Sequence, residues 1–492
     1  MRRLAAILLL VLAAAAALAA DQAAPRVTEG ILAEGTRWET AYVVSDSGVP
    51  GPTVMVVGGV HGNEPAGAAA AAQIRHWPLH RGKLVVVPRA NVPALRNRNR
   101  YMPTEEDRNL NRNFPRTANE PPRGELAAAL WDLTCNVKPD WLMDLHEGFD
   151  FRKTNPKTTG SSIIHVPGPV TTPQARRMLD AANATVADED KKLVLLRNPV
   201  AGSLARSAAD RLGARAFILE TTFAKQPLSL RARQHRLMVH RLLTDLGMVT
   251  CGADVMVPLR RAAGEIRVAL YDGGGTSGSK DRVAAALAGV KGLRLERVGP
   301  GDVLAGALDQ FDVLIVPGGS GSKEAAAITP KGREAIRRFV GGGRGYVGIC
   351  AGAYLAAANY SWSLAILDAD VIDRKHWKRG TGTVQIELTP EGRRVLGGRA
   401  EQFGIRYANG PLLAPANRPD IPDFAALARF RSEMNKNDAP KGIMLDTPAI
   451  ACGEYGRGRV LVSSPHPEST DGLAPLLHNA VRWAAKSVPA DP

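Results

Sequence analysis

Short apolar runs alternate with alanine-rich stretches of helical character along most of this chain. Runs such as TVMVVGGV (residues 53–60), DWLMDLH (140–146) and ARAFILETT (214–222) are separated by stretches such as EPAGAAAAAQIRHW (64–77). Strands that alternate with helices build a parallel or mixed sheet that helices cover on both faces. The sequence therefore predicts an α/β fold.

The same alternation begins again near residue 264, where EIRVALYDGGGTS (265–277) provides a new first strand that ends in a glycine-rich turn. The 492 residues exceed what one hydrophobic core usually organises, so two domains are expected. We expect a mixed-sheet domain over 25–257, a linker over 258–264, and a mainly parallel, flavodoxin-like domain over 265–488.

The first twenty residues have the layout of a cleavable secretory signal. A basic start, MRR, is followed by the apolar run LAAILLLVLAAAAALAA and then by DQAAP, with ALA at 17–19 as a small-x-small cleavage site. The alternative is an N-terminal membrane anchor, although the run is short for a bilayer span and no cysteine follows it for lipid attachment. With a signal peptide at 1–20, we expect an exported bacterial protein, periplasmic or secreted, without a transmembrane segment in the mature chain.

The formal net charge of +15 favours anionic partners, such as the polymers and lipid head groups of a cell envelope. The alternative is an arginine-rich composition inherited from a biased genome. The basic residues do not form a block with interleaved aromatic residues, which argues against nucleic-acid binding.

The four cysteines are too few and too scattered for a disulfide scaffold or a cysteine-built zinc site. A disulfide between Cys135 and Cys251 remains open, since it requires α-carbons within about 7 Å of each other.

Two histidines and a glutamate follow the ends of two apolar strands. His61 and Glu64 come directly after VMVVGGV, and His146 closes DWLMDLH. Two histidines and one carboxylate are a ligand set that zinc hydrolases use, with one coordination position left for water. We expect these three residues to bind Zn²⁺, with Asp144 and Glu147 as neighbours that orient the imidazole. A buried structural histidine is the alternative for each histidine taken alone.

The motifs HGNEPAG, NLNRNFP and DLHE resemble, in this order, the zinc carboxypeptidase family of the carboxypeptidase A type. The resemblance is strongest to its compact branch near succinylglutamate desuccinylase, aspartoacylase and murein peptide amidase, and it covers nearly all of residues 40–250. It implies that Asn111 and Arg112 hold a substrate carboxylate, which suits the fork geometry of a guanidinium. It also implies that Arg100 polarises the scissile carbonyl, with Arg98 as the competing assignment.

The strand ARAFILETT ends at Glu220, where the resemblance places a catalytic glutamate. A carboxylate beside an activated water can accept its proton and pass it to the leaving amine. We expect Glu220 to be this general base, the alternative being an ordinary carboxylate at a strand end. Asn109 stands where the family usually has aspartate, which bears on the geometry of the carboxylate pocket.

The stretch GICAGAYLA (348–356) places Cys350 in a strand-to-helix turn and resembles the nucleophile elbow of class I glutamine amidotransferase-like domains. A helix N-terminus and a nearby base favour the thiolate form of a cysteine. SSPHPE supplies His466 and Glu468, two residues apart, so both side chains point the same way in an extended segment. The resemblance implies a Cys350–His466–Glu468 triad.

The loop PGGSGS follows a strand of its own, and Gly318, Gly319 and Ala351 are expected to offer backbone N–H groups to an oxyanion. YDGGGTS, PGGSGS, GICAGAYLA, YANGP and SSPHPE together resemble the N-terminal domain of some biotin-protein ligases over about residues 265–485. A pocket that binds its ligand without turnover is the alternative to a working triad.

The sequence thus predicts an exported zinc-dependent amide hydrolase, of metallocarboxypeptidase or deacylase type. Its expected substrate is a peptide or acylated amino acid with a free carboxylate, such as a fragment of cell-wall peptide. An amidotransferase-like domain follows, and amidase activity of this domain is left open. The alternative is a non-catalytic binding protein with two clefts for peptide or cell-wall fragments.

Overall fold

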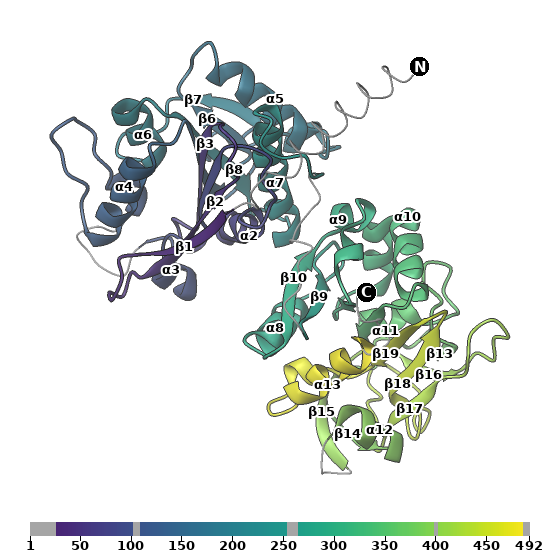
Figure 1. The fold of residues 1–492 in the computed structure, drawn as a ribbon. Helices are drawn as coiled ribbons and strands as arrows, with labels where there is room; N and C mark the ends of the chain where they lie inside the picture. The colour runs from purple at the N-terminus through teal and green to yellow at the C-terminus, as the bar shows by residue number, and fades with distance from the viewer. Residues whose placement is uncertain (1–25, 102–108, 253–263, 398–401, 486–492) are drawn as a thin grey trace, which may run out of the picture. The chain divides into compact units, whose positions relative to one another are not determined.

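The computed structural model describes residues 26–101, 109–252, 264–397 and 402–485. The expected signal peptide and nearly all of the expected linker lie outside the described residues. The chain divides between residues 258 and 259 into two compact units, which are described separately below (Figure 1). Within the described ranges, no helix has both the length and the apolar character that crossing a membrane requires.

The first unit contains an eight-stranded mixed sheet in the order β1-β2-β4-β3-β5-β8-β6-β7. Four neighbouring strands, β4, β3, β5 and β8, run parallel, and β1, β2 and β6 pair antiparallel with their inner neighbours. All eight residues of β5 are buried, as expected for a central strand covered on both faces. The strands are β1 (Arg26–Leu32), β2 (Thr40–Asp46), β3 (Thr53–Gly58), β4 (Lys83–Val87), β5 (Trp141–Gly148), β6 (Ser162–His165), β7 (Val194–Arg197) and β8 (Arg215–Thr222).

Helices pack on both faces of this sheet (Figure 1). Successive strand residues face opposite sides. Met143 and Leu219 thus pack with α2, α5 and α7, whereas Leu142 and Ile218 pack with α4 and α6. The helices are α2 (Pro65–Ile74), α3 (Val92–Asn97), α4 (Glu125–Val137), α5 (Thr171–Asn183), α6 (Leu204–Leu212) and α7 (Leu228–Asp245), with short 3-10 helices η1 (Leu110–Arg112) and η2 (Glu189–Lys191).

The alanine-rich helix α2 lies unusually close to the sheet. A Cβ atom on Gly67 would meet the carbonyl oxygen of Leu145 at 2.5 Å, and one on Gly58 would meet the carbonyl oxygen of Gly67 at 2.5 Å. Only glycine fits at these two positions without displacement of the backbone. This close approach holds the loop between β3 and α2, which carries His61 and Glu64, against the end of β5.

The second unit contains a nine-stranded sheet in the order β10-β9-β11-β12-β19-β18-β17-β14-β15 and a separate β13-β16 pair. Pairing is parallel from β10 to β19 and antiparallel from β19 to β15. The strands are β9 (Ile266–Tyr271), β10 (Leu293–Val298), β11 (Val313–Val316), β12 (Gly345–Ile349), β13 (Ala369–Ile372), β14 (Thr381–Leu388), β15 (Gln402–Ala408), β16 (Leu412–Pro415), β17 (Ala425–Phe430), β18 (Pro448–Tyr455) and β19 (Gly458–Ser463).

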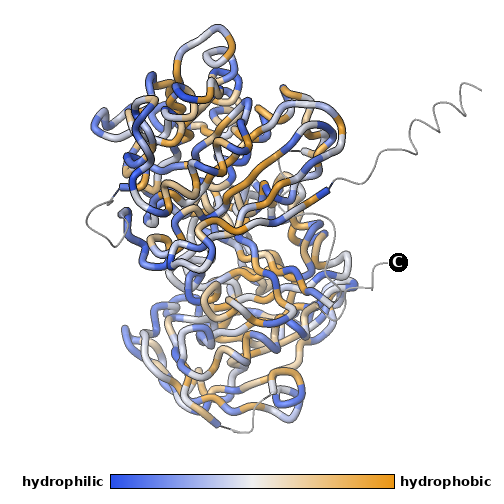
Figure 2. The backbone as a smooth tube through the Cα atoms, turned by 60° about the vertical axis from the view of Figure 1, so that its left-hand side comes forward, coloured by the Kyte–Doolittle hydropathy of each residue, from blue (hydrophilic) through white to orange (hydrophobic). Residues whose placement is uncertain are grey.

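One core cluster of the second unit joins the sheet residues Leu270, Ile315 and Val347 to Leu287 of α8 and Val481 of α13. The hydropathy-coloured tube shows short hydrophobic and hydrophilic segments that alternate along the backbone in both units (Figure 2). The helices are α8 (Ser279–Leu287), α9 (Pro300–Leu304), α10 (Gly321–Gly341), α11 (Ala351–Ala356), α12 (Pro390–Leu396) and α13 (Ala474–Ala485), with 3-10 helices η3 (Ala307–Gln310) and η4 (Pro467–Ser469).

The predicted α/β fold is confirmed in both units, and the first sheet is mixed as expected. The second sheet differs from the prediction of a mainly parallel, flavodoxin-like sheet, since it is parallel in one half and antiparallel in the other. The antiparallel half comes from residues 381–463, where hairpin-like strands follow one another without intervening long helices.

Candidate metal site and thiol site

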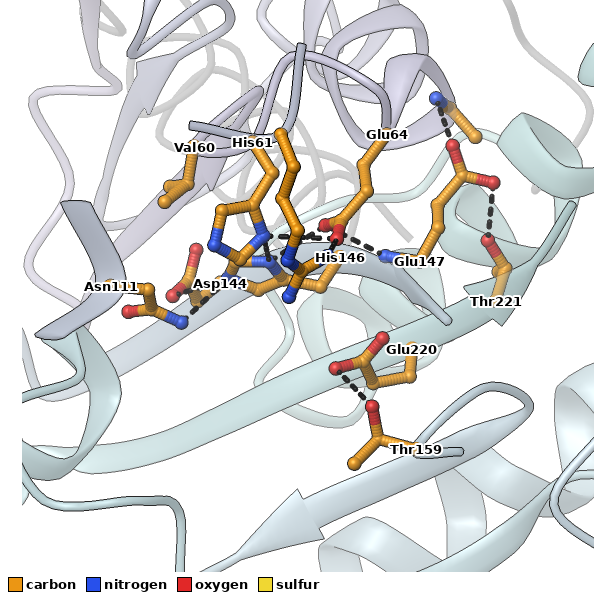
Figure 3. Close-up of polar contacts among 12 residues, drawn as sticks. Val60, His61, Glu64, Asn111, Asp144, His146, Glu147, Thr159, Glu220 and Thr221 are labelled. Carbon is orange, nitrogen blue, oxygen red and sulfur yellow. Dashed lines mark hydrogen bonds and ion pairs between the residues drawn. The ribbon is translucent and has the colours of Figure 1, made fainter. Parts of the chain in front are cut away.

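The first candidate site lies where three adjacent parallel strands of the first unit end. His61 and Glu64 follow the end of β3, His146 lies near the end of β5, and Glu220 lies near the end of β8 (Figure 3). The carboxyl ends of parallel strands share one edge of a sheet, where α/β proteins commonly place ligand sites. The structure therefore brings these four predicted residues together.

His61, Glu64 and His146 present a compact set of buried ligand atoms, with side chains only 2–3% exposed. Glu64 lies 2.9 Å from His61 Nδ1 through Oε1 and 2.9 Å from His146 Nδ1 through Oε2, and the two Nδ1 atoms are 3.2 Å apart. In a tetrahedral zinc site with bonds of about 2.0–2.1 Å, neighbouring ligand atoms lie about 3.3 Å apart. The three residues present therefore fit a zinc ion.

The outward-facing nitrogens of both imidazoles have polar partners. His61 Nε2 lies 2.9 Å from Asn109 Oδ1, which can only accept, so Nε2 donates and Nδ1 is the nitrogen that could bind a metal. His146 Nε2 lies 2.9 Å from Asp144 Oδ2. Burial opposes a charge on His146, but the carboxylates of Asp144 and Glu64 outweigh it and hold the pKa of His146 well above its usual range.

Glu64 is ionised in this arrangement. Its complete burial opposes ionisation, but the charge on His61 and the hydrogen bond from His146 outweigh this and hold the pKa of Glu64 well below its usual range. The backbone N–H of Glu147 donates to Glu64 Oε2 at 3.1 Å, and Arg100 Nη1 donates to Glu64 Oε1. Arg100, rather than Arg98, thus contacts the cluster.

Glu147 lies next to His146 in the chain but points to the opposite face of the sheet. Its Oε2 accepts from the backbone N–H of Ala66 at 2.8 Å, and its Oε1 pairs with Arg231 of α7. Thr221 Oγ1 lies 3.2 Å from His235 Nε2 and 3.4 Å from Glu147 Oε1. Glu147 therefore connects the beginning of α2 to β5 on the face of the sheet opposite the metal site.

Glu220 is buried and has one protein partner, since Thr159 Oγ1 donates to Oε1 at 3.0 Å (Figure 3). Among the described residues, Oε2 makes no hydrogen bond. Burial, reinforced by the nearby charge of Glu64, raises the pKa of Glu220 to about 7. A carboxylate with a pKa near neutrality can both accept and return a proton, which suits a general base.

Asn111 and Arg112 are placed differently from each other. Asn111 is buried, and its Oδ1 accepts from the N–H of Leu204 at 3.0 Å, so its carbonyl oxygen is engaged within the protein. Arg112 is half-buried, and its pKa is lowered by burial and by the neighbouring charges of Arg100 and Arg116. Substrate binding by Asn111, Arg112 and Arg100 stays a prediction.

The second candidate site surrounds Cys350 in the second unit. Cys350 follows β12 with a backbone φ of 50° and ψ of −95°, a region that non-glycine residues rarely occupy. Such strain persists only where the surroundings fix it, as in a nucleophile elbow. The thiol donates to the carbonyl oxygen of Ala408 at 3.4 Å and lines a hollow of about 580 Å³ together with His466.

His466 and Glu468 are paired, with Nδ1 lying 2.8 Å from Oε1. The same Oε1 accepts from Ser279 Oγ at 2.7 Å. Although burial opposes a charge on the ring, Cys350 and Glu468 raise the pKa of His466 to about 10. Its Nε2 makes no hydrogen bond within the described part of the chain. The structure therefore brings the three predicted triad residues together.

The three amides predicted for an oxyanion are not equivalent. The N–H of Gly318 donates to Ser279 Oγ at 2.9 Å and is thus engaged within the protein, which is a departure from the prediction. Gly319 lines the hollow beside Cys350, and Ala351 is the first residue of α11. An oxyanion role for the latter two stays a prediction.

Sequence reasoning assigned no role to Arg231, Ser279 or Thr159, and it did not recognise Asn109 as the partner of His61. A signal existed for Asn109, because asparagine two residues before a tight turn commonly accepts a backbone N–H, as it does here from Asn111 at 3.1 Å. Arg231 and its neighbour one helical turn later, His235, are polar residues on the buried side of α7. Because residues four apart lie on the same side of a helix, this spacing could have indicated that both side chains face the same neighbour. Both cysteines of the disulfide left open, Cys135 and Cys251, are free thiols.

Solved structures that are similar to parts of this chain were found, at low identity. The D,L-carboxypeptidase Csd4 from Helicobacter pylori, bound to mDAP, is 22% identical with a TM-score of 0.35, over 40% of this chain and 51% of its own. A succinylglutamate desuccinylase/aspartoacylase from Rhodobacter sphaeroides is 20% identical with a TM-score of 0.35, over 48% and 69%. An aspartoacylase family protein from Mesorhizobium loti is 21% identical with a TM-score of 0.35, over 47% and 73%. The chain thus spans about half the length of the first of these proteins.

No curated protein is significantly similar to this chain. Two family models match parts of it. Residues 308–385, which include Cys350, match the model described as biotin-protein ligase, N terminal. Residues 50–245, which include the candidate metal ligands and Glu220, match the model described as succinylglutamate desuccinylase/aspartoacylase catalytic domain.

Proposed function

We infer that the first unit is a zinc-dependent amide hydrolase that acts on a peptide or an acylated amino acid with a free carboxylate. The observation that carries this proposal is the cluster of His61, Glu64 and His146 beside Glu220, a carboxylate whose Oε2 makes no hydrogen bond among the described residues. The match of residues 50–245 to a desuccinylase/aspartoacylase catalytic domain supports the same class of reaction.

Different residues of the site would have different roles in such a reaction. When bound, zinc would supply Lewis acidity that polarises the amide carbonyl and makes water nucleophilic near neutral pH. Glu220 accepts the proton of the attacking water at Oε2 and returns it to the amine nitrogen as the carbon–nitrogen bond breaks. Thr159 orients Glu220, and Asp144 and Asn109 orient the two imidazoles.

A carboxylate on the substrate is favoured by the cationic side of the site. Arg112 and Arg100 lie close enough for their charges to repel, and Arg116 adds to this repulsion. An anion that binds between neighbouring cations offsets their mutual repulsion. A guanidinium also matches a carboxylate with two parallel hydrogen bonds. We therefore propose that Arg112 holds this carboxylate and that Arg100 faces the scissile carbonyl.

Export of the chain, with the periplasm or the exterior as its location, remains part of the proposal and is motivated by the signal-like pattern of residues 1–20. Fragments of cell-wall peptide would be an available substrate there. Determination of the N-terminus of the protein expressed in a bacterial host tests this part, because cleavage near residue 19 is expected.

The proposal is tested with the full-length protein loaded with zinc. Metal analysis is expected to give about one zinc per chain. Release of amines is then measured for N-acyl amino acids, peptides with a free C-terminus and murein peptides, each compared with the same compound carrying an amide in place of the carboxylate. Hydrolysis of a carboxylate-bearing compound by wild type but not by Glu220→Gln is expected. Binding of these compounds without hydrolysis would instead support a non-catalytic binding protein.

A further inference from the structure

Two hollows in the second unit meet at Cys350. One measures about 580 Å³ and the other about 440 Å³, and both are lined by Gly319, Ser320, Cys350 and Ala408. A ligand centred on the thiol would therefore have room in two directions. The two hollows differ sharply in chemistry, and this difference defines the kind of ligand that fits.

The larger hollow is cationic. Arg282, Lys323 and Arg406 line it, and the described residues of its lining include no aspartate or glutamate. Arg282 donates through Nε to Ser469 Oγ at 2.7 Å, which holds its guanidinium at the rim. In the described part of the chain, none of the three cations forms an ion pair with a carboxylate. Three unpaired cations around one hollow create a field that attracts an anion.

The smaller hollow is aromatic. Phe, Trp and Tyr make up 5% of the chain, yet this hollow is lined by Tyr354, Tyr360, Trp362 and Trp377. The rings of Tyr360 and Trp362 are stacked with centroids 4.5 Å apart, and Trp377 is 48% exposed. Arg374 lies over Tyr360 at 4.4 Å. Tyr354, Tyr360 and Trp362 are half-buried and Trp377 is exposed, so part of this aromatic area can be covered by a ligand, as is typical of ligand sites.

We propose that this double hollow is a binding site for an anionic, ring-bearing acyl compound. Its carboxylate lies among Arg282, Lys323 and Arg406, its ring packs against Trp362 and the other aromatic side chains of the smaller hollow, and the carbonyl that joins the two parts lies over Cys350. The proposal concerns the second unit and is independent of hydrolysis by the first. Glutamine fits it poorly, because that compound has no ring for the aromatic hollow.

The test measures binding to the full-length protein carrying Glu220→Gln, which keeps the first unit from hydrolysing the probes, by isothermal titration calorimetry with matched probes. N-benzoylglycyl-glutamate carries the ring and the carboxylates, N-acetylglycyl-glutamate lacks the ring, and N-benzoylglycyl-glutamine amide lacks the carboxylates. The ring and the carboxylates are each expected to tighten binding at least about tenfold. N-acetylmuramoyl-alanyl-glutamate forms a further arm, since tighter binding of this probe would identify a sugar ring rather than an aromatic ring as the natural group.

Variants assign the binding to this site. Trp362→Ala should remove the advantage of the ring while the probe without a ring binds as before, and Trp362→Phe should restore part of it. Arg406→Ala should remove the advantage of the carboxylates. Arg338→Ala, an exposed arginine outside both hollows, is the matched control and should change neither. Thermal unfolding verifies that each variant is folded.

Two results would overturn the proposal. One is equal affinity for the probes with and without the ring in the protein with an unchanged second unit, including the absence of binding by all of them. The other is unchanged binding of N-benzoylglycyl-glutamate by folded Trp362→Ala and Arg406→Ala, which would place that binding elsewhere, for instance in the first unit. A loss of hydrolysis in Glu220→Gln bears only on the first unit, so the two proposals fail independently.

Discussion

His146 and Glu220 are register partners on the neighbouring parallel strands β5 and β8. Register partners project from the same face of a sheet, so the imidazole and the carboxylate stand side by side at the edge where both strands end. The hydrogen bonds of the sheet, rather than a loop, thus fix the distance between a candidate metal ligand and the candidate base. Sites built on strands hold their geometry more tightly than sites built on loops.

Glu220→Gln should abolish hydrolysis while the protein keeps its metal. The change removes the proton acceptor but little volume, and general-base catalysis typically contributes about 10²–10⁴-fold to a rate. We expect kcat to fall by about that factor, with zinc content unchanged in metal analysis. Glu125→Gln, an exposed glutamate at the beginning of α4, is the control and should retain full activity. Undiminished activity of Glu220→Gln would place the base elsewhere.

Asp144→Asn should weaken zinc binding without removing a ligand. Asp144 is buried and its Oδ2 lies 2.9 Å from His146 Nε2, so it orients the ring and makes it a stronger donor to metal. Loss of such a partner typically costs about 10–100-fold in metal affinity. Competition with a chromogenic chelator measures this, and Asp180→Asn on the exposed side of α5 serves as the control. Equal affinities of the two variants would count against the assignment of His146 as a ligand.

The parts of the site that lie in apolar strands were predictable from the sequence. Runs such as VMVVGGV and AFILE indicate buried strands, and a polar residue at the end of such a run lies at the edge of the sheet. This reasoning alone selected His61 and His146, whereas Glu220 was selected by its strand end together with the family resemblance. The interpretation of Asn111 and Arg112 relied on resemblance, and the structure shows Asn111 Oδ1 accepting from the N–H of Leu204.

The parts that depend on long-range packing were not predictable in this way. Arg231 meets Glu147 across 84 residues of sequence, and Ser279 meets Glu468 across 189. No local pattern specifies such partners. The antiparallel strands between 381 and 455 were missed because many of them alternate buried and exposed residues, as β14 does, and lack the continuous apolar runs of the central strands.

Zinc affinity should fall as pH falls through the neutral range. Zinc binds the neutral imidazole, whereas Asp144 and Glu64 hold the pKa of His146 well above its usual range, so a proton must leave when zinc binds. At pH values below that raised pKa, the apparent zinc affinity falls by about tenfold per pH unit for each proton that zinc binding releases. Chelator competition at several pH values measures the slope. In Asp144→Asn the pKa of His146 should be lower and the slope near neutral pH flatter.

Arg231→Met should destabilise the first unit strongly. The Arg231–Glu147 pair is buried, with side-chain exposures of 10% and 0%, and removal of the arginine leaves a buried carboxylate without its partner. Breaking such a pair typically costs about 3–5 kcal/mol. Chemical denaturation should show this loss, and the double variant Glu147→Gln with Arg231→Met should recover much of it because the unpaired charge is gone. An equally unstable double variant would show that the guanidinium acts through packing alone.

Cys350 should be alkylated by iodoacetamide faster than the other three cysteines, and the rate should depend on His466. Burial opposes a charge on His466, but Cys350 and Glu468 raise its pKa to about 10, and a cation beside a reacting sulfur stabilises the negative charge that develops on it. His466→Ala removes this charge and should slow labelling several-fold, as should Ser279→Ala to a smaller extent, because Ser279 donates to Glu468 at 2.7 Å. Peptide mapping by mass spectrometry assigns the label to each thiol.

Cys452 is the internal control, since burial raises its pKa to about 12 and leaves it unreactive near neutral pH. A Cys350 that reacts no faster than Cys452, or whose rate is unchanged by His466→Ala, would show that the three residues form no working triad. The strained elbow would then serve only to shape the double hollow.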